Sequence, residues 1–144
     1  MTYCFVLKED GAPSFEGELG TDETARLSGD PNGETIDDEK LETFIEDKAE
    51  PEVNAYCRKH YDVPFAVDAV PKEIKSRTMD VAIFYSYGTK PSERIRVRYE
   101  DAIKFLKEVA NGNIVLDVET EIAVSAVKPE TTFKSNARLF TRDA

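Results

Sequence analysis

The chain has 144 residues, a length that suits one domain with a modest hydrophobic core and excludes a multidomain enzyme. Hydrophobic residues make up 40% of the chain and charged residues 33%, which is the composition of a globular protein and excludes wholesale disorder. The net charge of −10 disfavours contact with a phosphate backbone, so we expect no tight binding to DNA.

The first 36 residues are predicted to be irregular and acidic, with one short helix near residues 21–27. Glycines and prolines interrupt every periodic pattern in this stretch: Gly11, Pro13, Gly17, Gly20, Gly29, Pro31 and Gly33. The N-terminus lacks the basic region of a secretory signal, and no apolar run reaches the roughly 18 residues of a membrane span. We therefore expect a protein of a cytoplasm-like compartment without a membrane segment.

A long helix is predicted to begin at Asp37 and Asp38, which are suited to an N-cap. Apolar residues then recur at helical spacing: Leu41, Phe44, Ile45, Ala49, Val53, Tyr56 and Tyr61. Pro51 lies inside this stretch, so the helix either kinks there or breaks and restarts with Pro51 in its first turn. Because the apolar spacing continues across Pro51, we expect a kink or a tight break.

Two further helices are predicted between residues 71 and 112. An extended connection at Pro64 precedes them, because the residue before a proline is disfavoured in a helix. The first helix begins at Pro71, ends at Gly88 and has one apolar face: Ile74, Thr78, Val81, Ala82, Phe84 and Tyr85. The second runs from about residue 92 to residue 110, and the Asn-Gly pair at residues 111–112 is typical of a helix C-terminus.

The chain after Gly112 is predicted to be an extended arm. Its apolar residues alternate as in a strand through residue 127, and Pro129 marks a turn. Phe133, Leu139 and Phe140 in a terminal segment indicate docking on a neighbouring subunit or partner, with folding back onto the chain's own helices as the alternative. The predicted fold is mainly α: a small bundle of three to four helices in residues 1–112 and an extended or β arm in residues 113–144.

Charge is divided unevenly along the chain. Residues 1–56 carry 16 acidic and 4 basic residues, whereas residues 57–107 carry 11 basic and 7 acidic residues. Such a chain can attract a copy of itself head to tail, in contacts that close into rings. Arg94 and Arg98 share one helix face and are candidates for contact with an acidic neighbour. The alternative is that both sets are solvated surface, because exposed ion pairs are individually weak.

Residues 28–39, SGDPNGETIDDE, can be compared with a calcium-binding loop. Asp30, Asn32, Gly33 and Glu39 fall at positions 3, 5, 6 and 12 of an EF-hand, but Ser28 stands where the first Asp is required. The preceding residues do not form a convincing entering helix. We therefore interpret the segment as an acidic turn that caps the next helix, with a calcium-responsive regulatory module as the alternative.

The sequence offers no candidate catalytic, cofactor-binding or metal-binding residues. Cys4 and Cys57 are too few and too far apart for a zinc site, and we expect them to be buried hydrophobic residues. His60 has no nucleophile near it in a recognisable motif. A glycine-rich phosphate loop, HExxH and GxSxG are all absent. We therefore expect neither enzymatic activity nor a cofactor.

Three segments of the chain match a known pattern in their order and spacing. The first comprises DPNGETID at residues 30–37, VNAY at 53–56 and HYDVP at 60–64. The second is RYEDAIKFLKEVANG at residues 98–112, and the third is FTRD at residues 140–143. Together they cover roughly residues 27–144, and the ordered set resembles the Mu-like bacteriophage neck proteins, the family named for the gene-36 product of phage Mu.

The resemblance implies a head–tail connector, or adaptor: a virion structural protein that forms a homo-oligomeric ring, a dodecamer in the virion, beneath the portal. Its partners would be the portal protein and tail or stopper proteins, while DNA would pass through the channel without specific binding. It would reside in the virion neck, and in the host cytoplasm during assembly. Arm docking would involve Phe133, Leu139, Phe140, Arg142 and Asp143. Another neck or tail-completion component, such as a stopper or terminator, is the alternative.

Overall fold

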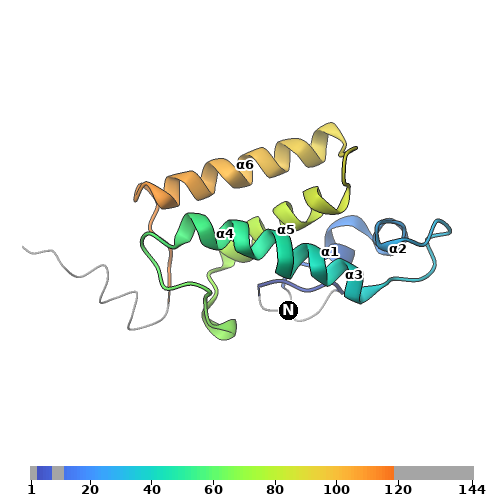
Figure 1. The fold of residues 1–144 in the computed structure, drawn as a ribbon, viewed down its shortest axis with the longest axis horizontal. Coiled ribbons are helices and arrows are strands. Elements are labelled where there is room, and N and C mark those ends of the chain that lie inside the picture. The colour runs from blue at the N-terminus through green and yellow to red at the C-terminus, as the bar shows by residue number, and fades with distance from the viewer. Residues whose placement is uncertain (1–2, 8–11, 119–144) are drawn as a thin grey trace, which may run out of the picture.

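The computed structural model describes residues 3–7 and 12–118 (Figure 1). These residues contain no β-strand, only an isolated bridge between Phe5 and Ser14, so the predicted mainly helical fold is confirmed. The helices are α1 (Phe15–Leu19), α2 (Thr21–Ser28), α3 (Asp38–Thr43), the π-helical η1 (Phe44–Ala49), α4 (Glu50–Cys57), the 3-10 turn η2 (Val67–Ala69), α5 (Lys72–Ser86) and α6 (Glu93–Ala110).

The described helices form an elongated bundle of three long segments. The first is continuous through α3, η1 and α4, after which α5 runs back along it and α6 returns in the first direction (Figure 1). Helix α5 packs against η1, α4 and α6, and α4 also packs against α6. The short helices α1 and α2 lie at the α3 end, while the loop between α4 and α5 lies at the opposite end (Figure 1).

The first long helix contains a π-helical turn that the sequence did not predict. Its buried hydrophobic residues recur every four positions: Leu41, Ile45, Ala49, Val53 and Cys57. In an α-helix each such step overshoots a full turn by about 40°, so the row would leave the core face. The wider turn of η1 offsets this drift. As predicted, an α-helix restarts with Pro51 in its first turn, but a π turn rather than a break connects it to the preceding helix.

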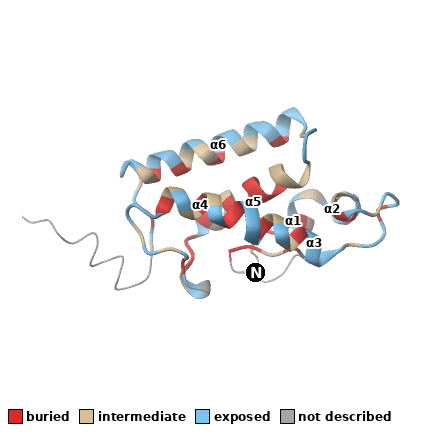
Figure 2. Ribbon diagram, in the orientation of Figure 1, coloured by how far each residue is buried: buried red, intermediate tan, exposed pale blue. Residues whose placement is uncertain are grey.

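Helix α5 is buried on more sides than the predicted single face. The expected residues Ile74, Thr78, Val81 and Ala82 are buried, but Met79, Asp80 and Ile83 are buried as well. This burial follows from the central position of α5, which contacts two other long segments (Figure 2). Its hydrophobic pattern is consequently less one-sided than that of a surface helix.

The predicted ends of the helices are confirmed by their capping contacts. The Asp37 side chain accepts a hydrogen bond from the Lys40 N–H at 3.2 Å and begins α3. The Ser92 hydroxyl accepts from the Ile95 N–H at 3.3 Å and begins α6. Helix α6 ends at Ala110 with Asn111 as its C-cap, and Gly112 follows with a φ of +83°, a conformation that side chains with a Cβ rarely adopt.

The N-terminal third is more ordered than predicted. Helix α2 confirms the expected short helix, while α1 is an additional helix of five residues, too short to give a periodic signal. Tyr3, Cys4 and Val6 are buried against the bundle. The Tyr3 hydroxyl donates to the Asn54 side chain and accepts from the Phe65 N–H, both at 2.7 Å. Tyr3 therefore joins α4 to the loop that follows it.

The chain immediately after Gly112 packs on its own bundle. Leu116 is 5% exposed, and its N–H donates to the Tyr61 hydroxyl at 2.7 Å. Ile114 and Val118 contact the same core, whereas Val115 is 69% exposed. The strand-like alternation thus buries side chains on the chain's own helices without strand pairing. The rest of the predicted arm, including Phe133, Leu139, Phe140, Arg142 and Asp143, lies outside the described residues.

Candidate interaction surface

Arg98 contacts carboxylates of its own chain. Its guanidinium donates to Asp80 at 2.5 Å and to Glu18 at 3.3 Å, which ties α6 to α5 and α1. Burial raises the pKa of the Asp80 carboxyl, while Arg98 and Arg77 oppose that rise. Because Arg98 is engaged within its subunit, less of its charge is available to a neighbour. Its predicted role in partner contact stays a prediction.

Arg94 remains exposed one turn earlier on α6. Its charge lowers the pKa of Tyr87 at the end of α5, although burial of that ring has the larger, opposite effect. The structure therefore places the two predicted arginines in different environments: Arg98 is a half-buried joint between helices, and Arg94 lies on the surface. Of these two arginines, only Arg94 is exposed enough to contact another molecule.

Three helices bring one carboxylate and several aromatic rings together. The Tyr85 hydroxyl donates to Glu52 Oε1 at 2.7 Å, and the Tyr99 hydroxyl donates to Glu52 Oε2 at 2.9 Å. The Phe84 ring stacks on Tyr99 with a centroid distance of 4.0 Å and an angle of 16°. Lys48 Nζ lies 6.0 Å from the centroid of the Tyr85 ring. We call these five residues the Glu52 cluster.

The Glu52 cluster is joined by two hydrogen bonds and is only partly covered. Burial raises the pKa values of Tyr85 and Tyr99, and the hydrogen bonds to Glu52 raise them further, so both hydroxyls stay protonated donors. Phe84 and both tyrosines are half-buried, so none of the three residues is fully covered. Aromatic faces attract cations, and a carboxylate beside them adds a second attraction. The surface suits an arginine, a lysine or an apolar side chain of a partner.

Sequence reasoning assigned the aromatic members of this cluster to helix faces but missed their meeting point. One local signal was available: the first long helix carries Lys48, Glu52 and Tyr56 at four-residue spacing, so a carboxylate lies between a cation and an aromatic ring on one helix face. That pattern is common on solvated helices. The contact with α5 and α6 depends on the bundle geometry, which the spacing does not contain.

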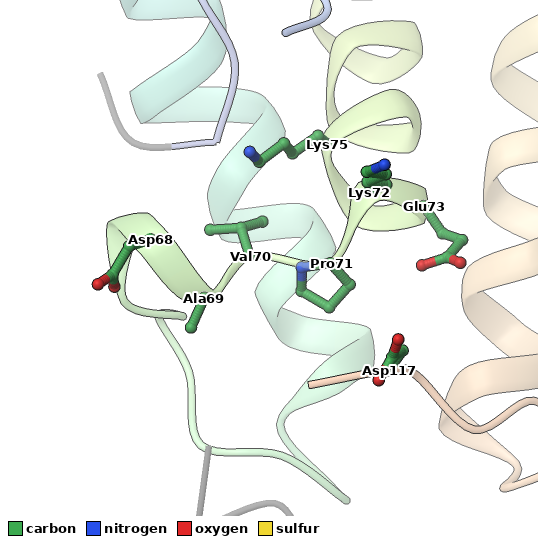
Figure 3. Close-up of a pocket in the computed structure, with 8 residues that line it drawn as sticks. All are labelled: Asp68, Ala69, Val70, Pro71, Lys72, Glu73, Lys75 and Asp117. Carbon is green, nitrogen blue, oxygen red and sulfur yellow. The ribbon is translucent and has the colours of Figure 1, made fainter. Parts of the chain in front are cut away.

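A cavity of about 400 Å³ opens at the start of α5. Figure 3 shows Lys72 and Lys75 on the helix and Asp117 near its base, with Asp68 on the preceding turn. Glu73 also lines the cavity, so it carries both lysines and carboxylates. Mixed charge of this kind does not select one ligand, and the lining contains neither a histidine nor a cysteine.

The residues with potential chemistry occupy structural positions. His60 Nε2 lies 3.1 Å from the Ala110 carbonyl oxygen and links the ends of α4 and α6. Cys4 and Cys57 are buried free thiols, as predicted. Burial raises the pKa of Cys57 to about 12 and also raises that of Cys4, so neither forms a thiolate at neutral pH.

The acidic turn at residues 28–39 is closed by its own backbone. The Asp30 carboxylate accepts hydrogen bonds from the N–H groups of Asn32, Glu34 and Thr35 at 2.7–3.0 Å. These bonds lower the pKa of Asp30 and occupy the oxygens that a cation would need. Over the described ranges, no group of three histidine, cysteine or acidic side chains is arranged to hold a metal ion. Helix α2 ends at Ser28, directly before the turn, so the expectation that no helix enters it was wrong. The hydrogen bonds on Asp30 nevertheless favour the capping turn over the calcium loop.

The fold and these contacts define a small helical protein with a partly aromatic, acidic surface. Its sequence matches the family described as Bacteriophage Mu, Gp36 over residues 14–134, and the chain belongs to that family of phage and prophage proteins. It is 26% identical over 91 residues to the Mu-like prophage FluMu protein gp36 of Haemophilus influenzae, covering 63% of this chain and 62% of that protein. It is 30% identical over 73 residues to gene product J of Escherichia phage Mu, covering 51% and 50%.

These matches span about half to three fifths of the length of each curated relative. The match over residues 14–134 establishes the family, and the activity of the whole relatives does not pass to this chain by similarity alone. Among the described helices, none combines the length and the apolar character needed to cross a membrane.

Proposed function

We propose that this protein is a head–tail connector of a phage or prophage. In this role it forms a homo-oligomeric ring in the neck and joins the portal of the capsid to the tail or stopper proteins. The observation that carries the proposal is the family match over residues 14–134, which covers the helical bundle and the start of the arm. The protein would be a component of the virion and would assemble in the host cytoplasm.

The charge distribution supports this role. The chain has a net charge of −10, so a ring of copies would repel DNA passing through its channel and would not retain it by phosphate contacts. The acidic first part and the more basic middle part favour contact between neighbouring copies. A charge map of an assembled ring with a basic lumen would contradict this part of the proposal.

The direct test is the position of the protein in particles. We expect a tagged copy, produced from an induced phage or prophage, to co-purify with virions and to be labelled at the head–tail junction in electron micrographs. Deletion of the gene should leave filled heads and tails that do not join. Absence of the protein from virions, or labelling elsewhere on the particle, would refute the connector function.

Further measurements separate the connector from the rival functions. A stopper would be labelled at the junction but would require a connector to bind the portal, so a pull-down with purified portal protein distinguishes the two. A tail terminator would give tails of abnormal length when deleted. The calcium-responsive module predicts heat release in a calorimetric titration with millimolar calcium. We expect no heat, because the Asp30 oxygens already accept three backbone hydrogen bonds.

A further inference from the structure

Two members of the Glu52 cluster, Lys48 and Glu52, lie on a long helix that is rich in acidic residues. The segment Asp38–Cys57, which comprises α3, η1 and α4, carries seven acidic residues and two lysines. One of the lysines, Lys48, is already placed over the Tyr85 ring. The cluster therefore presents half-buried rings in an acidic setting, and its geometry already accepts a cation against one ring face.

The C-terminal part of the chain has the complementary composition. Residues 131–142, TTFKSNARLFTR, contain three basic residues and no acidic residue. The same twelve residues contain Phe133, Leu139 and Phe140. A segment that combines basic and apolar side chains matches a surface that offers carboxylates and half-buried aromatic residues, since arginine stacks on rings and pairs with carboxylates at once.

We propose that residues 131–142 of one copy bind the Glu52 cluster and the adjoining acidic helix of a second copy. Arg138 or Arg142 stacks on the Phe84–Tyr99 pair and pairs with carboxylates of the acidic helix, while Phe140 packs beside the rings. This inference rests on the connector proposal and names the surface that receives the arm within the ring.

The connecting chain is long enough to reach a second copy. The hydrogen bond between Leu116 and Tyr61 holds the last described residues close to the end of α4. Glu52 lies five residues before Cys57, which is roughly 8 Å along the helix. The twelve residues between Val118 and residue 131 span up to about 40 Å. Such a reach allows the segment to contact an adjacent subunit, which the ring of the connector proposal places beside the bundle.

The test uses the full-length protein with Phe140 replaced by photoreactive benzoyl-phenylalanine. Copies labelled with ¹⁵N are mixed with unlabelled copies, irradiated and analysed by mass spectrometry. We expect cross-linked peptides from residues 44–56 or 84–103, with the two halves carrying different isotopes. Cross-links confined to one isotope would show that the chain's own cluster is the receptor. Cross-links to other surfaces, or none, would overturn the proposal as well.

Matched variants identify the contacts that produce the cross-link. Glu52→Gln should reduce the cross-linking yield by about fivefold or more. The control Asp101→Asn removes an exposed charge on α6 and should leave the yield unchanged. The double change Arg138→Gln with Arg142→Gln alters no residue of the bundle and should reduce the yield similarly, with Lys128→Gln as its control. Equal yields in all four variants would contradict the proposal.

Failure of this inference differs from failure of the connector function. A protein found at the head–tail junction whose cross-links map elsewhere would retain the function and lose this surface. Cross-links at the Glu52 cluster in a protein that is absent from virions would retain the surface and lose the function.

Discussion

Tyr3 offers a sharp test of how the N-terminal segment stabilises the bundle. Its side chain is 1% exposed, and its ring packs against Phe65 with a centroid distance of 5.9 Å. Its backbone N–H donates to Glu50 Oε2 at 3.1 Å. Tyr3→Phe keeps the ring and this backbone bond and removes only the hydroxyl, so the change isolates the two hydrogen bonds made by that group.

The expected loss of stability follows from what the hydroxyl leaves behind. The Phe65 N–H is buried and would lose its acceptor at 2.7 Å, while the Asn54 side chain would lose a donor in a part-buried place. A buried polar group left without a partner costs about 1–3 kcal/mol. We expect Tyr3→Phe to lower the free energy of unfolding by that amount, and the melting temperature by roughly 3–10 °C.

Urea unfolding followed by far-ultraviolet circular dichroism measures this difference. Tyr87→Phe is the matched control, because its half-buried hydroxyl donates to Glu23 at 3.1 Å where water can replace it. The control should lose less than about 0.5 kcal/mol. A Tyr3→Phe protein as stable as the control would refute the view that the Tyr3 hydroxyl joins α4 to the following loop.

Three other predictions follow from burial and charge. Burial raises the pKa of Tyr3 to about 12, so the folded state holds this proton to a higher pH than the unfolded state does. The free energy of unfolding should therefore be unaffected below pH 10 and fall toward pH 12, and it should fall less steeply in Tyr3→Phe. Urea midpoints of both proteins at pH 9 and pH 11 measure this difference. Leu116→Ala should cost about 2–4 kcal/mol in urea unfolding, against less than about 0.5 for the exposed Val115→Ala; equal effects would contradict the packing of this segment. Arg98→Ala should cost roughly 1–3 kcal/mol because it leaves a buried carboxylate partner, whereas Arg96→Ala, with a half-exposed side chain, should be near neutral.

Local signals in the sequence were sufficient for three of the helix boundaries. Asp37, Ser92 and Gly112 act through contacts within a few residues of themselves, so their roles could be predicted without the fold. The π turn before Pro51 could not, because a four-residue spacing deviates little from helical periodicity within any one turn. Helix α1 was missed for a similar reason, since five residues give no period.

The candidate surface was less predictable than the helices. Asp80 is not among the residues that predict the apolar face of α5, and its burial follows from the packing of α5 between two other segments. Glu52 is one of several carboxylates on an acidic helix, and no local pattern distinguishes it. Its partners Tyr85 and Tyr99 come from two other helices, and such long-range pairing depends on how the helices cross.

The burial of Leu116 changes where the arm can be separated from the bundle. A chain ending at Gly112 lacks Leu116 and its hydrogen bond to Tyr61, so it loses part of the core as well as the arm. Loss of assembly in that truncation would then have two explanations. A chain ending at Val118 keeps these contacts and removes residues 131–142, so a loss of assembly with unchanged helical content would point to the arm alone.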